Sequence, residues 1–196
     1  ITVGVEPADN LMEEGKQGLT HHIHDFWDYN IYKNAVPKKA KIITAIGMFY
    51  DMEDPNQFIS DSAKALTEDG IFIAQLMCLK NMLDSNDVGN ICHEHLEYYS
   101  FKSLEYLFKN NGLEIFDVEI NDVNGGSYRI YAKKIGAVMK ENREAIERVQ
   151  AVRQSEKDFD NKQVHIDFYT NCKSQSTLSQ LVEQHLPAQF FRATTS

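Results

Sequence analysis

Residues 113–134, LEIFDVEI-NDVNGG-SYRIYAKK, carry the strongest information about the fold class of this chain. Both flanks are rich in β-branched and aromatic residues, and six residues that include Gly125 and Gly126 separate them. A connection this short joins antiparallel strands, because parallel strands need a crossover of a dozen or more residues. We therefore predict an antiparallel hairpin of strands 113–120 and 127–134, with positive φ angles at the glycine turn.

Upstream of the hairpin, predicted strands alternate with predicted helices. Strands are predicted at 1–6, 20–25, 41–48 and 71–77, and helices at about 10–17, after Asp54-Pro55 and after Ser100. Asp54 and Ser100 have side chains suited to capping a helix N-terminus, and proline favours the first helical position. The run 41–48 is apolar and β-rich, as a central parallel strand should be. This alternation predicts a doubly wound α/β sheet.

The residues after the hairpin favour helix. The charged run from Val138 through Arg153 predicts one long helix that leaves the sheet. At the other end, the chain begins at Ile1 in mid-strand and without methionine, which we interpret as a fragment or a processed chain. We therefore divide the chain into a partial α/β domain, residues 1–135, and a helical linker with the start of a C-terminal domain, residues 136–196.

Composition argues against several classes of partner. The 196 residues carry a net charge of −9, which disfavours a nucleic-acid surface because such a surface needs a basic stripe. Cys78, Cys92 and Cys172 lie far apart and form no CxxC pair, as expected for reduced thiols and not for a zinc site. No apolar run reaches membrane-spanning length, and no signal peptide is visible. We expect a cytoplasmic protein that binds neither nucleic acid nor a membrane.

The run His93-Glu94-His95 allows three interpretations: a metal site, solvent-exposed loop histidines, or a general base. In an extended segment the two histidines share one face and Glu94 points away, so only two ligands converge and we expect no metal. The other two interpretations stay open from the residues alone. A neutral imidazole, with a pKa of about 6.5, can take a proton near neutral pH, and a nearby carboxylate can orient its ring.

Four stretches together resemble the S-adenosyl-L-methionine-dependent C-methyltransferases that act on nucleotide-linked keto-sugars: Glu6-Pro7, TAIGMFYDMEDP (44–55), CHEHLEYYS (92–100) and NGGSYR (124–129). The resemblance covers residues 1–135. It implies the Rossmann-like sheet of class I methyltransferases, mostly parallel with an antiparallel C-terminal hairpin, here without its first strand and followed by a long helix. It also implies S-adenosylmethionine as cofactor and a small-molecule nucleotide sugar as substrate, in carbohydrate biosynthesis.

The resemblance also implies which residues bind the cofactor. Glu6, at the carboxyl end of a strand, has two oxygens that match the vicinal hydroxyls of a ribose. Asp25 and Phe26 would hold the adenine, and the backbone of Ala45 and Gly47 would run beneath the methionine part. Each acid has a simpler alternative, since Glu6 can cap a helix and Asp25 can be an ordinary loop residue.

In the resembling family the second histidine of the HEH run is the proposed base, which here is His95. Glu94 would support it, and His93 would be structural. A tyrosine hydroxyl can donate to sugar or diphosphate oxygens, although packing is an equally good interpretation for one of the two tyrosines in the run. The implied substrate-binding residues are Cys92, Tyr98, Tyr99, Gly126 and Asp51.

The chain departs from the family at two of these positions. Cys92 stands where the family commonly has tyrosine, and Asp51 stands where these enzymes often have histidine. A thiol donates a weaker hydrogen bond than a phenol, so proton handling and substrate can differ. Two alternatives therefore remain: an O- or N-methyltransferase of the same fold, and a non-catalytic fragment that binds cofactor poorly. The antiparallel hairpin disfavours a third, a nicotinamide oxidoreductase.

Overall fold

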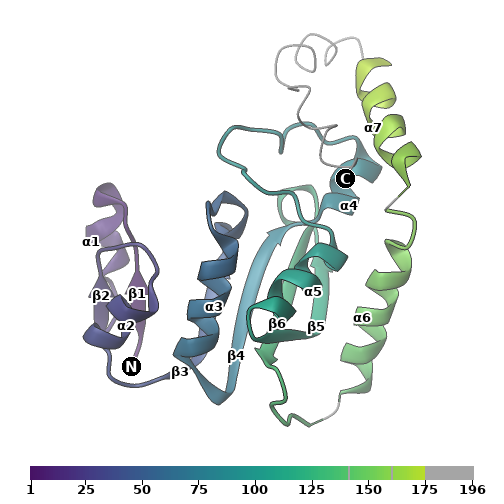
Figure 1. The fold of residues 1–196 in the computed structure, drawn as a ribbon. Coiled ribbons are helices and arrows are strands. Elements are labelled where there is room, and N and C mark those ends of the chain that lie inside the picture. Colours follow the sequence, from purple (N-terminus) through teal and green to yellow (C-terminus); the bar gives the residue numbers. More distant parts are fainter. Residues whose placement is uncertain (141, 160, 175–196) are drawn as a thin grey trace.

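The computed structural model describes residues 1–140, 142–159 and 161–174, and Figure 1 shows their arrangement. The strands are β1 (Val3–Val5), β2 (His21–Ile23), β3 (Ala40–Ile46), β4 (Leu66–Met77), β5 (Leu113–Asn121) and β6 (Ser127–Lys134). The α-helices are α1 (Met12–Gly15), α2 (Tyr29–Ala35), α3 (Pro55–Ala65), α4 (Leu79–Ser85), α5 (Phe101–Asn110), α6 (Arg143–Ser155) and α7 (Lys162–Ser174). Short 3₁₀ helices are η1 (Asp9–Leu11), η2 (Phe49–Asp51) and η3 (Val123–Gly125).

Four strands form the main sheet in the order β3-β4-β6-β5. Strand β3 runs parallel to β4, whereas β6 is antiparallel to both β4 and β5. The hairpin register pairs Leu113 with Lys134, and its turn holds Gly125 at φ 77° and Gly126 at φ 130°. These angles favour glycine, because a Cβ atom would be strained there. The predicted antiparallel hairpin, which closes a partly parallel α/β sheet, is confirmed.

Strands β1 and β2 form a separate parallel sheet, on the left in Figure 1. Within the described residues, β3 pairs on one side only, with β4. The prediction of a central strand at 41–48 is therefore wrong, and Ile42 and Ile46 are 62% and 52% exposed. The prediction was wrong because an apolar run of this kind is typical of a strand with neighbours on both sides. Strand β4 also begins earlier than predicted, because Leu66 already pairs with Ala40.

The core lies between the main sheet and its helices. Phe72 of β4 meets Phe108 of α5 with ring centroids 5.6 Å apart, and both side chains are fully buried. Tyr128 and Ile130 of β6 are buried in the same cluster. Aromatic pairs in this geometry add about 0.5–1.5 kcal/mol beyond the area that they bury. This packing holds β4 against α5.

The helix starts predicted at Asp54 and at Ser100 are confirmed. The Asp54 carboxylate accepts a hydrogen bond from the Gln57 N–H at 2.9 Å, and Pro55 occupies the first turn of α3. The Ser100 hydroxyl accepts from the Ser103 N–H at 3.2 Å, which caps α5. Caps of this kind contribute about 0.5–2 kcal/mol each.

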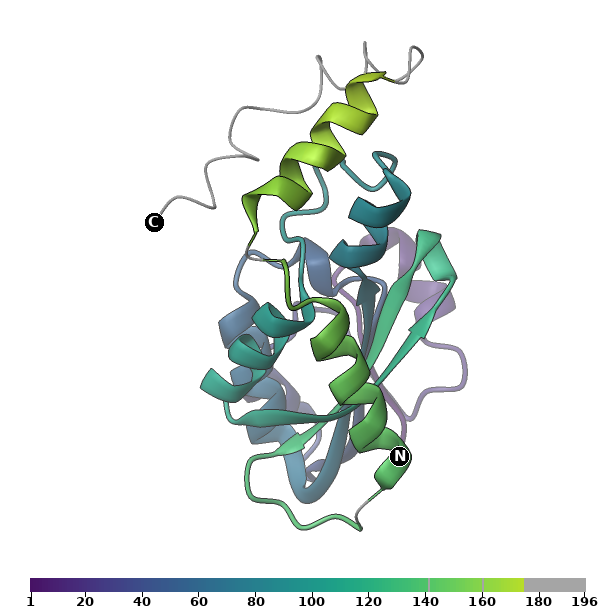
Figure 2. The same cartoon turned by 90° about the vertical axis from the view of Figure 1, so that its right-hand side faces the viewer.

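The segment after the hairpin differs from the prediction of one long helix that leaves the sheet. It forms two helices, and α6 packs against β5, as Figure 2 shows. Val149 and Val152 join the main core, and the Arg148 guanidinium contacts the Asp117 carboxylate at 2.6 Å. The apolar stripe of α6 was hidden among charged neighbours, which led to the wrong prediction. The last part of the predicted linker, residues 175–196, lies outside the described residues.

Candidate functional site

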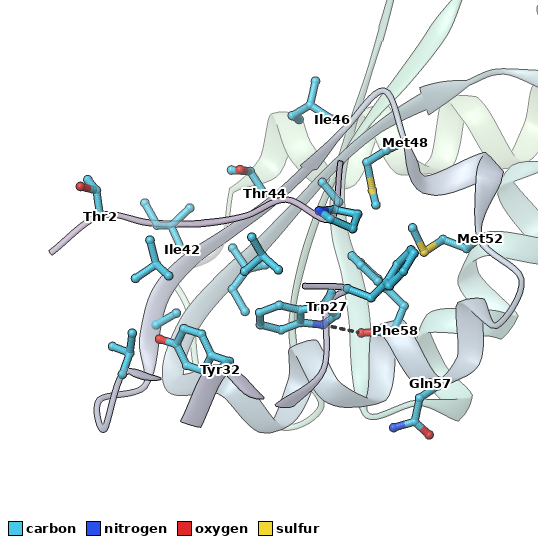
Figure 3. A pocket seen from close by; sticks show the side chains of 18 of the residues that line it. Thr2, Trp27, Tyr32, Ile42, Thr44, Ile46, Met48, Met52, Gln57 and Phe58 are labelled. Atoms are coloured by element: carbon cyan, nitrogen blue, oxygen red, sulfur yellow. Dashed lines mark hydrogen bonds between the residues drawn. The ribbon is translucent and has the colours of Figure 1, made fainter. Parts of the chain in front are cut away.

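A groove of about 1390 Å³ lies between β1 and the free edge of β3. Figure 3 shows Ile42, Thr44 and Ile46 along the β3 wall. The Trp27 indole N–H donates to the Phe58 carbonyl oxygen at 3.3 Å, which holds the ring in the lining of the groove. The groove exceeds the range of about 300–1,000 Å³ that is usual for small-molecule sites. It therefore has room for a cofactor and for further groups.

Three of the predicted site residues line this groove: Phe26, Ala45 and Asp51. The ring of Phe26 is 74% exposed, so it offers an apolar surface to a ligand, whereas Ala45 is buried. Glu6 lies between two lining residues, and Asp25 directly precedes Phe26. The structure thus brings the predicted cofactor residues to one region of the molecule.

The two predicted carboxylates contact their own local backbone. An oxygen of Glu6 accepts from the Ala8 N–H at 2.8 Å, and an oxygen of Asp25 accepts from the Phe26 N–H at 2.8 Å. Each contact occupies one of the two carboxylate oxygens and stabilises the turn after its strand. The local roles that the sequence allowed are therefore present, and cofactor roles for these residues remain predictions.

Strand β3 ends in a turn at Gly47, whose φ is 68°. The Gly47 N–H donates to the Gln75 carbonyl oxygen at 3.0 Å, and the Tyr50 hydroxyl donates to the Gly47 carbonyl oxygen at 3.3 Å. This turn leads into η2, which carries Asp51. It thereby places a polar residue at the carboxyl end of β3, where ligands bind in open α/β sheets.

One nitrogen of the His95 imidazole has a fixed partner. Nδ1 lies 2.8 Å from the main-chain carbonyl oxygen of Asn90, and the His95 side chain is half-buried. Because a carbonyl oxygen can only accept, the neutral ring carries its proton on Nδ1, and Nε2 keeps its lone pair. An imidazole held in this tautomer can take a proton through Nε2.

The His95 loop is attached to η2 through Tyr50. The N–H groups of Leu96 and Glu97 both donate to the Tyr50 carbonyl oxygen at 3.0 Å. The Tyr50 ring meets the His95 ring with centroids 4.5 Å apart. Since Asp51 follows Tyr50 and lines the groove, His95 lies beside the η2 end of the groove.

Charged groups of the HEH motif act on Asp51. Burial raises the pKa of the Asp51 carboxyl above its ordinary value, the charge of His95 lowers it, and the charge of Glu94 raises it. The Glu94 carboxylate lies 3.1 Å from Nε2 of His93, and both side chains are exposed. Glu94 therefore faces His93 and acts on Asp51 through its charge.

The remaining predicted substrate residues lie in different surroundings. Tyr98 donates its hydroxyl to the Asn90 carbonyl oxygen at 3.3 Å, the same acceptor that His95 uses, and burial raises its pKa. Tyr99 is buried against Phe49 with centroids 5.5 Å apart, and its hydroxyl has no hydrogen-bond partner among the described residues. The ring of Tyr99 therefore packs in the core, and a substrate role for its hydroxyl remains a prediction. Cys92 is half-buried, and its thiol interacts with the Glu94 carboxylate.

Gly126 lies at a close contact between the hairpin turn and α4. Its carbonyl oxygen accepts from the Cys78 N–H at 3.0 Å, and a Cβ atom added at Gly126 would lie 2.6 Å from the Asn81 Cβ. The nearby Arg129 donates to the Gln75 side-chain oxygen at 2.9 Å, so its guanidinium already has a protein partner. Only a residue without a side chain fits at Gly126.

The sequence did not predict the contacts made by Asp87, Asn90 and Tyr50. The run from Asp87 through Asn90 is rich in turn-forming residues, which indicates a tight turn. It does not indicate which carbonyl oxygen faces the imidazole, because main-chain acceptors have no residue signature. The ring of Tyr50 belongs to a stretch that predicts core packing as readily as contact with a base.

Within the described ranges, no group of three or more His, Cys, Asp or Glu side chains is placed to hold a metal ion. The His21-His22-x-His24 segment forms β2 and the residue after it, and His24 contacts Asp9 at 3.2 Å. Over the same described part of the chain, no helix is long and apolar enough to cross a membrane.

Sequence comparisons with known proteins identify the relatives of this chain. A family model described as a methyltransferase domain matches residues 2–118. Among curated proteins, the C-methyltransferase NovU of Streptomyces niveus is 28% identical over 137 residues. The match covers 69% of this chain and 33% of that protein, so the chain spans about a third of its relative's length.

Solved structures share the fold. A possible histamine N-methyltransferase from Thermotoga maritima matches with a TM-score of 0.50 at 16% identity, over 68% of this chain and 73% of that chain. An S-adenosylmethionine-dependent methyltransferase from Clostridium acetobutylicum matches with a TM-score of 0.52 at 14% identity, over 68% and 74%. The predicted Rossmann-like α/β class, with its antiparallel C-terminal strands, is confirmed.

Proposed function

The chain belongs to the family of methyltransferase domains, and we propose that it transfers a methyl group to a carbon of a nucleotide-activated deoxy-keto-sugar. The family supports methyl transfer with S-adenosylmethionine as cofactor. Similarity to the C-methyltransferase NovU supports carbon as the acceptor atom. The HEH motif and the resemblance that it carries support the sugar.

We place the cofactor beside the groove, because three candidate ligands follow the carboxyl ends of three strands. Glu6 follows β1, Asp25 lies shortly after β2, and Gly47 follows β3. Ligands of open α/β sheets bind at this end of the strands. We assign Glu6 to the ribose hydroxyls, Asp25 and Phe26 to the adenine, and the backbone of Ala45 and Gly47 to the methionine part.

Carbon methylation leaves one chemical task to the protein, which is removal of a proton from the carbon next to the ketone. When bound, S-adenosylmethionine supplies an activated methyl group that this carbon then takes up. His95 removes the proton through Nε2, as a general base. The Asn90 carbonyl oxygen accepts from Nδ1 at 2.8 Å and so stabilises the imidazolium that results.

The other motif residues surround this base. Glu94 assists His95 by its charge, and Tyr98 shares the Asn90 carbonyl oxygen with His95. Asp51 lies between the groove and the motif, which suits a residue that contacts the sugar close to the methyl group. The proposed substrate-binding residues are Cys92, Tyr98, Tyr99, Gly126 and Asp51.

The contact between His95 Nδ1 and the Asn90 carbonyl oxygen carries the base assignment. His95→Gln should lower kcat by about 10²–10⁴-fold, the usual contribution of general base catalysis. His93→Gln is the matched control, since His93 is exposed and belongs to the same motif. Wild-type turnover by His95→Gln would remove the base assignment.

Solvent deuterium distinguishes carbon from oxygen or nitrogen methylation. Protein with S-adenosylhomocysteine and keto-sugar in deuterated water should place label at the reacting carbon, because the base removes and returns its proton. Methyl transfer to the sugar without such label would instead support an O- or N-methyltransferase.

Titration calorimetry with S-adenosylhomocysteine tests the cofactor site by itself. We expect micromolar binding, and Glu6→Gln should weaken it by about ten-fold, because hydrogen bonds to a charged group contribute about 1.5–3 kcal/mol. Absence of binding would support the alternative of a fragment that binds cofactor poorly. The unpaired edge of β3 is the structural basis of that alternative.

We also propose the domain division and the cellular setting. Residues 1–135 would form a partial cofactor-binding domain, and residues 136–196 a helical linker and the start of a C-terminal domain, with α6 of the linker packed on the first domain through Val149 and Val152. A cytoplasmic location is supported by three unpaired cysteine thiols, since disulfides are rare in that compartment. The net charge of −9 supports a small-molecule substrate over nucleic acid.

A further inference from the structure

Asp87 and Asn90 lie between the end of α4 and the HEH motif. We propose that they form a positioning pair that sets the tautomer and the orientation of His95. The inference rests on the proposed role of His95 as the base, and it adds two residues that neither touch the reacting atoms nor belong to the motif. Three groups link the pair to the base, from the imidazole outward.

The first link is the Asn90 carbonyl oxygen. It accepts from His95 Nδ1 at 2.8 Å and from the Tyr98 hydroxyl at 3.3 Å. A carbonyl oxygen has two lone pairs, so it can accept both bonds at once. Rotation of this one peptide group would remove the partner of Nδ1 and allow the proton to move to Nε2, where it would block the base.

The second link is the Asn90 side chain, which holds that peptide group in place. Its amide nitrogen donates to a carboxylate oxygen of Asp87 at 2.7 Å and to the Asn124 carbonyl oxygen at 3.3 Å. The two amide hydrogens are thus used by two different segments. The side chain and the carbonyl group belong to one residue, so fixing the first restricts rotation of the second.

The third link is the Asp87 carboxylate. Its other oxygen accepts from the Gly89 N–H at 2.8 Å, and the Asp87 N–H donates to the Met82 carbonyl oxygen of α4 at 2.9 Å. A Cβ atom added at Gly125 would lie 2.9 Å from the carboxylate, so the hairpin turn packs directly against it. Charge-assisted hydrogen bonds are about twice as strong as neutral ones, which makes Asp87 the anchor of the loop.

The test reads the tautomer directly, by nitrogen NMR of ¹⁵N-histidine-labelled protein. The chain has seven histidines, and His95→Gln identifies the His95 signals. We expect neutral His95 to be protonated at Nδ1 in the wild type and to populate the Nε2-protonated form in Asn90→Ala. We also expect a fall in kcat of about ten- to a hundred-fold, with the affinity for S-adenosylhomocysteine within about two-fold.

Two further variants separate positioning from general destabilisation. Asn110→Ala is the matched control, because Asn110 is exposed at the end of α5, and it should keep both tautomer and rate. Asp87→Asn keeps the side-chain shape but removes a charged acceptor. If Asn90→Ala does not fold, the tautomer and the rate are measured on Asp87→Asn. The double variant should be no slower than the slower single variant, because both changes break the same bond.

The outcomes of this test distinguish a failure of the positioning pair from a failure of the proposed function. An Nδ1-protonated His95 in both folded variants would overturn the positioning pair, even if their activity fell. A tautomer change in the variants would support the pair, even if the wild type methylated no keto-sugar, and the failure would then belong to the proposed substrate.

Discussion

The rings of Tyr50 and His95 meet edge to face, with centroids 4.5 Å apart and planes inclined by 63°. The Tyr50 carbonyl oxygen also accepts two N–H groups of the His95 loop, each at 3.0 Å. Tyr50 therefore contacts the candidate base through its ring and the loop of that base through its main chain. Its neighbour Asp51 lines the groove, so the segment Tyr50-Asp51 connects the groove to the His95 loop.

Tyr50→Ala should lower both activity and stability, because it removes a buried ring that packs against His95. We expect a loss of about 3–5 kcal/mol in the free energy of unfolding, as for other large buried aromatic side chains. Tyr50→Phe keeps the ring and loses only the hydroxyl bond to the Gly47 carbonyl oxygen, which contributes about 1 kcal/mol. Methyl-transfer kinetics measure the activity of the two variants, and urea unfolding measures their stability. A catalytic loss in Tyr50→Phe as large as in Tyr50→Ala would show that the hydroxyl takes part in the chemistry.

Gly126→Ala should destabilise the hairpin turn. The added Cβ would lie 2.6 Å from the Asn81 Cβ, and the φ of 130° is strained for any residue with a side chain. Strain and overpacking together predict a loss of about 2–4 kcal/mol. Gly18→Ala is the control, because its φ of 74° carries backbone strain but no atom lies within 4 Å of the added carbon. Equal losses in urea unfolding would contradict the close contact between the turn and α4.

Asp61 should contribute stability that depends on pH. Its carboxylate is buried and accepts from the Tyr29 N–H at 3.1 Å and from Gln57 and Lys64 at 2.8 Å each. Burial alone would raise the pKa of Asp61, but these hydrogen bonds outweigh it and hold the pKa below its ordinary value. The stabilisation is therefore fully present above the unfolded pKa of about 3.9 and is lost as pH falls through the lower native value.

Asp61→Ala should lower the free energy of unfolding by about 1–3 kcal/mol near neutral pH, because buried donors lose their acceptor. The difference from the wild type should shrink as pH falls below the unfolded pKa of about 3.9 and the wild-type carboxyl becomes protonated. Asp84→Ala is the control, since Asp84 is exposed and pairs only at the surface of α4. A difference that does not change with pH would contradict the lowered pKa.

Glu156 should show the opposite pH dependence. Its carboxylate is buried, accepts from the Phe101 N–H at 2.8 Å and accepts from the Tyr128 hydroxyl. Burial raises the pKa of Glu156 by more than these bonds lower it. The native state thus holds this proton more tightly than the unfolded chain does. Its contribution to stability should fall as pH rises from about 4.3, the unfolded value, to the higher native value.

Glu156→Gln tests this sign, because glutamine keeps an acceptor oxygen and does not ionise. Urea unfolding of the variant should lack the decline of stability that Glu156 contributes above about pH 4.3. Glu156→Ala should cost about 2–4 kcal/mol, because two buried donors lose their partner. Glu147→Gln on the exposed face of α6 is the matched control. Stability of Glu156→Gln that follows the wild type at every pH would contradict the prediction.

The features that could be predicted from sequence are local. The hairpin depends on six residues with two glycines, and the starts of α3 and α5 depend on single capping residues. The edge position of β3 depends on which strands pair with it, and no residue within β3 encodes that. The break between α6 and α7 accompanies the burial of Glu156, which contacts residues far away in the sequence.

In the candidate site, too, local features could be predicted from the sequence and contacts between distant segments could not. His95 belongs to a recognisable motif, so its residue type and spacing could be interpreted before the fold was known. Its tautomer depends on a main-chain oxygen of Asn90 and could not be predicted, because every residue carries such an oxygen. Glu94 has a histidine on each side in the sequence, which does not indicate which of the two its carboxylate contacts; in the structure it contacts His93.

The division of the strands into two sheets has a consequence for motion. The unit of β1, β2 and α2 has a small core of its own, and it is tied to α3 through Ala65 and the bond from Tyr29 to Asp61. Units with few buried contacts open at lower free energy than the core of a domain. Amide protons of β1 and β2 should therefore exchange with solvent well before those of β4 and β6. One wall of the groove belongs to this early-opening unit, so an occupant of the groove would slow its exchange selectively.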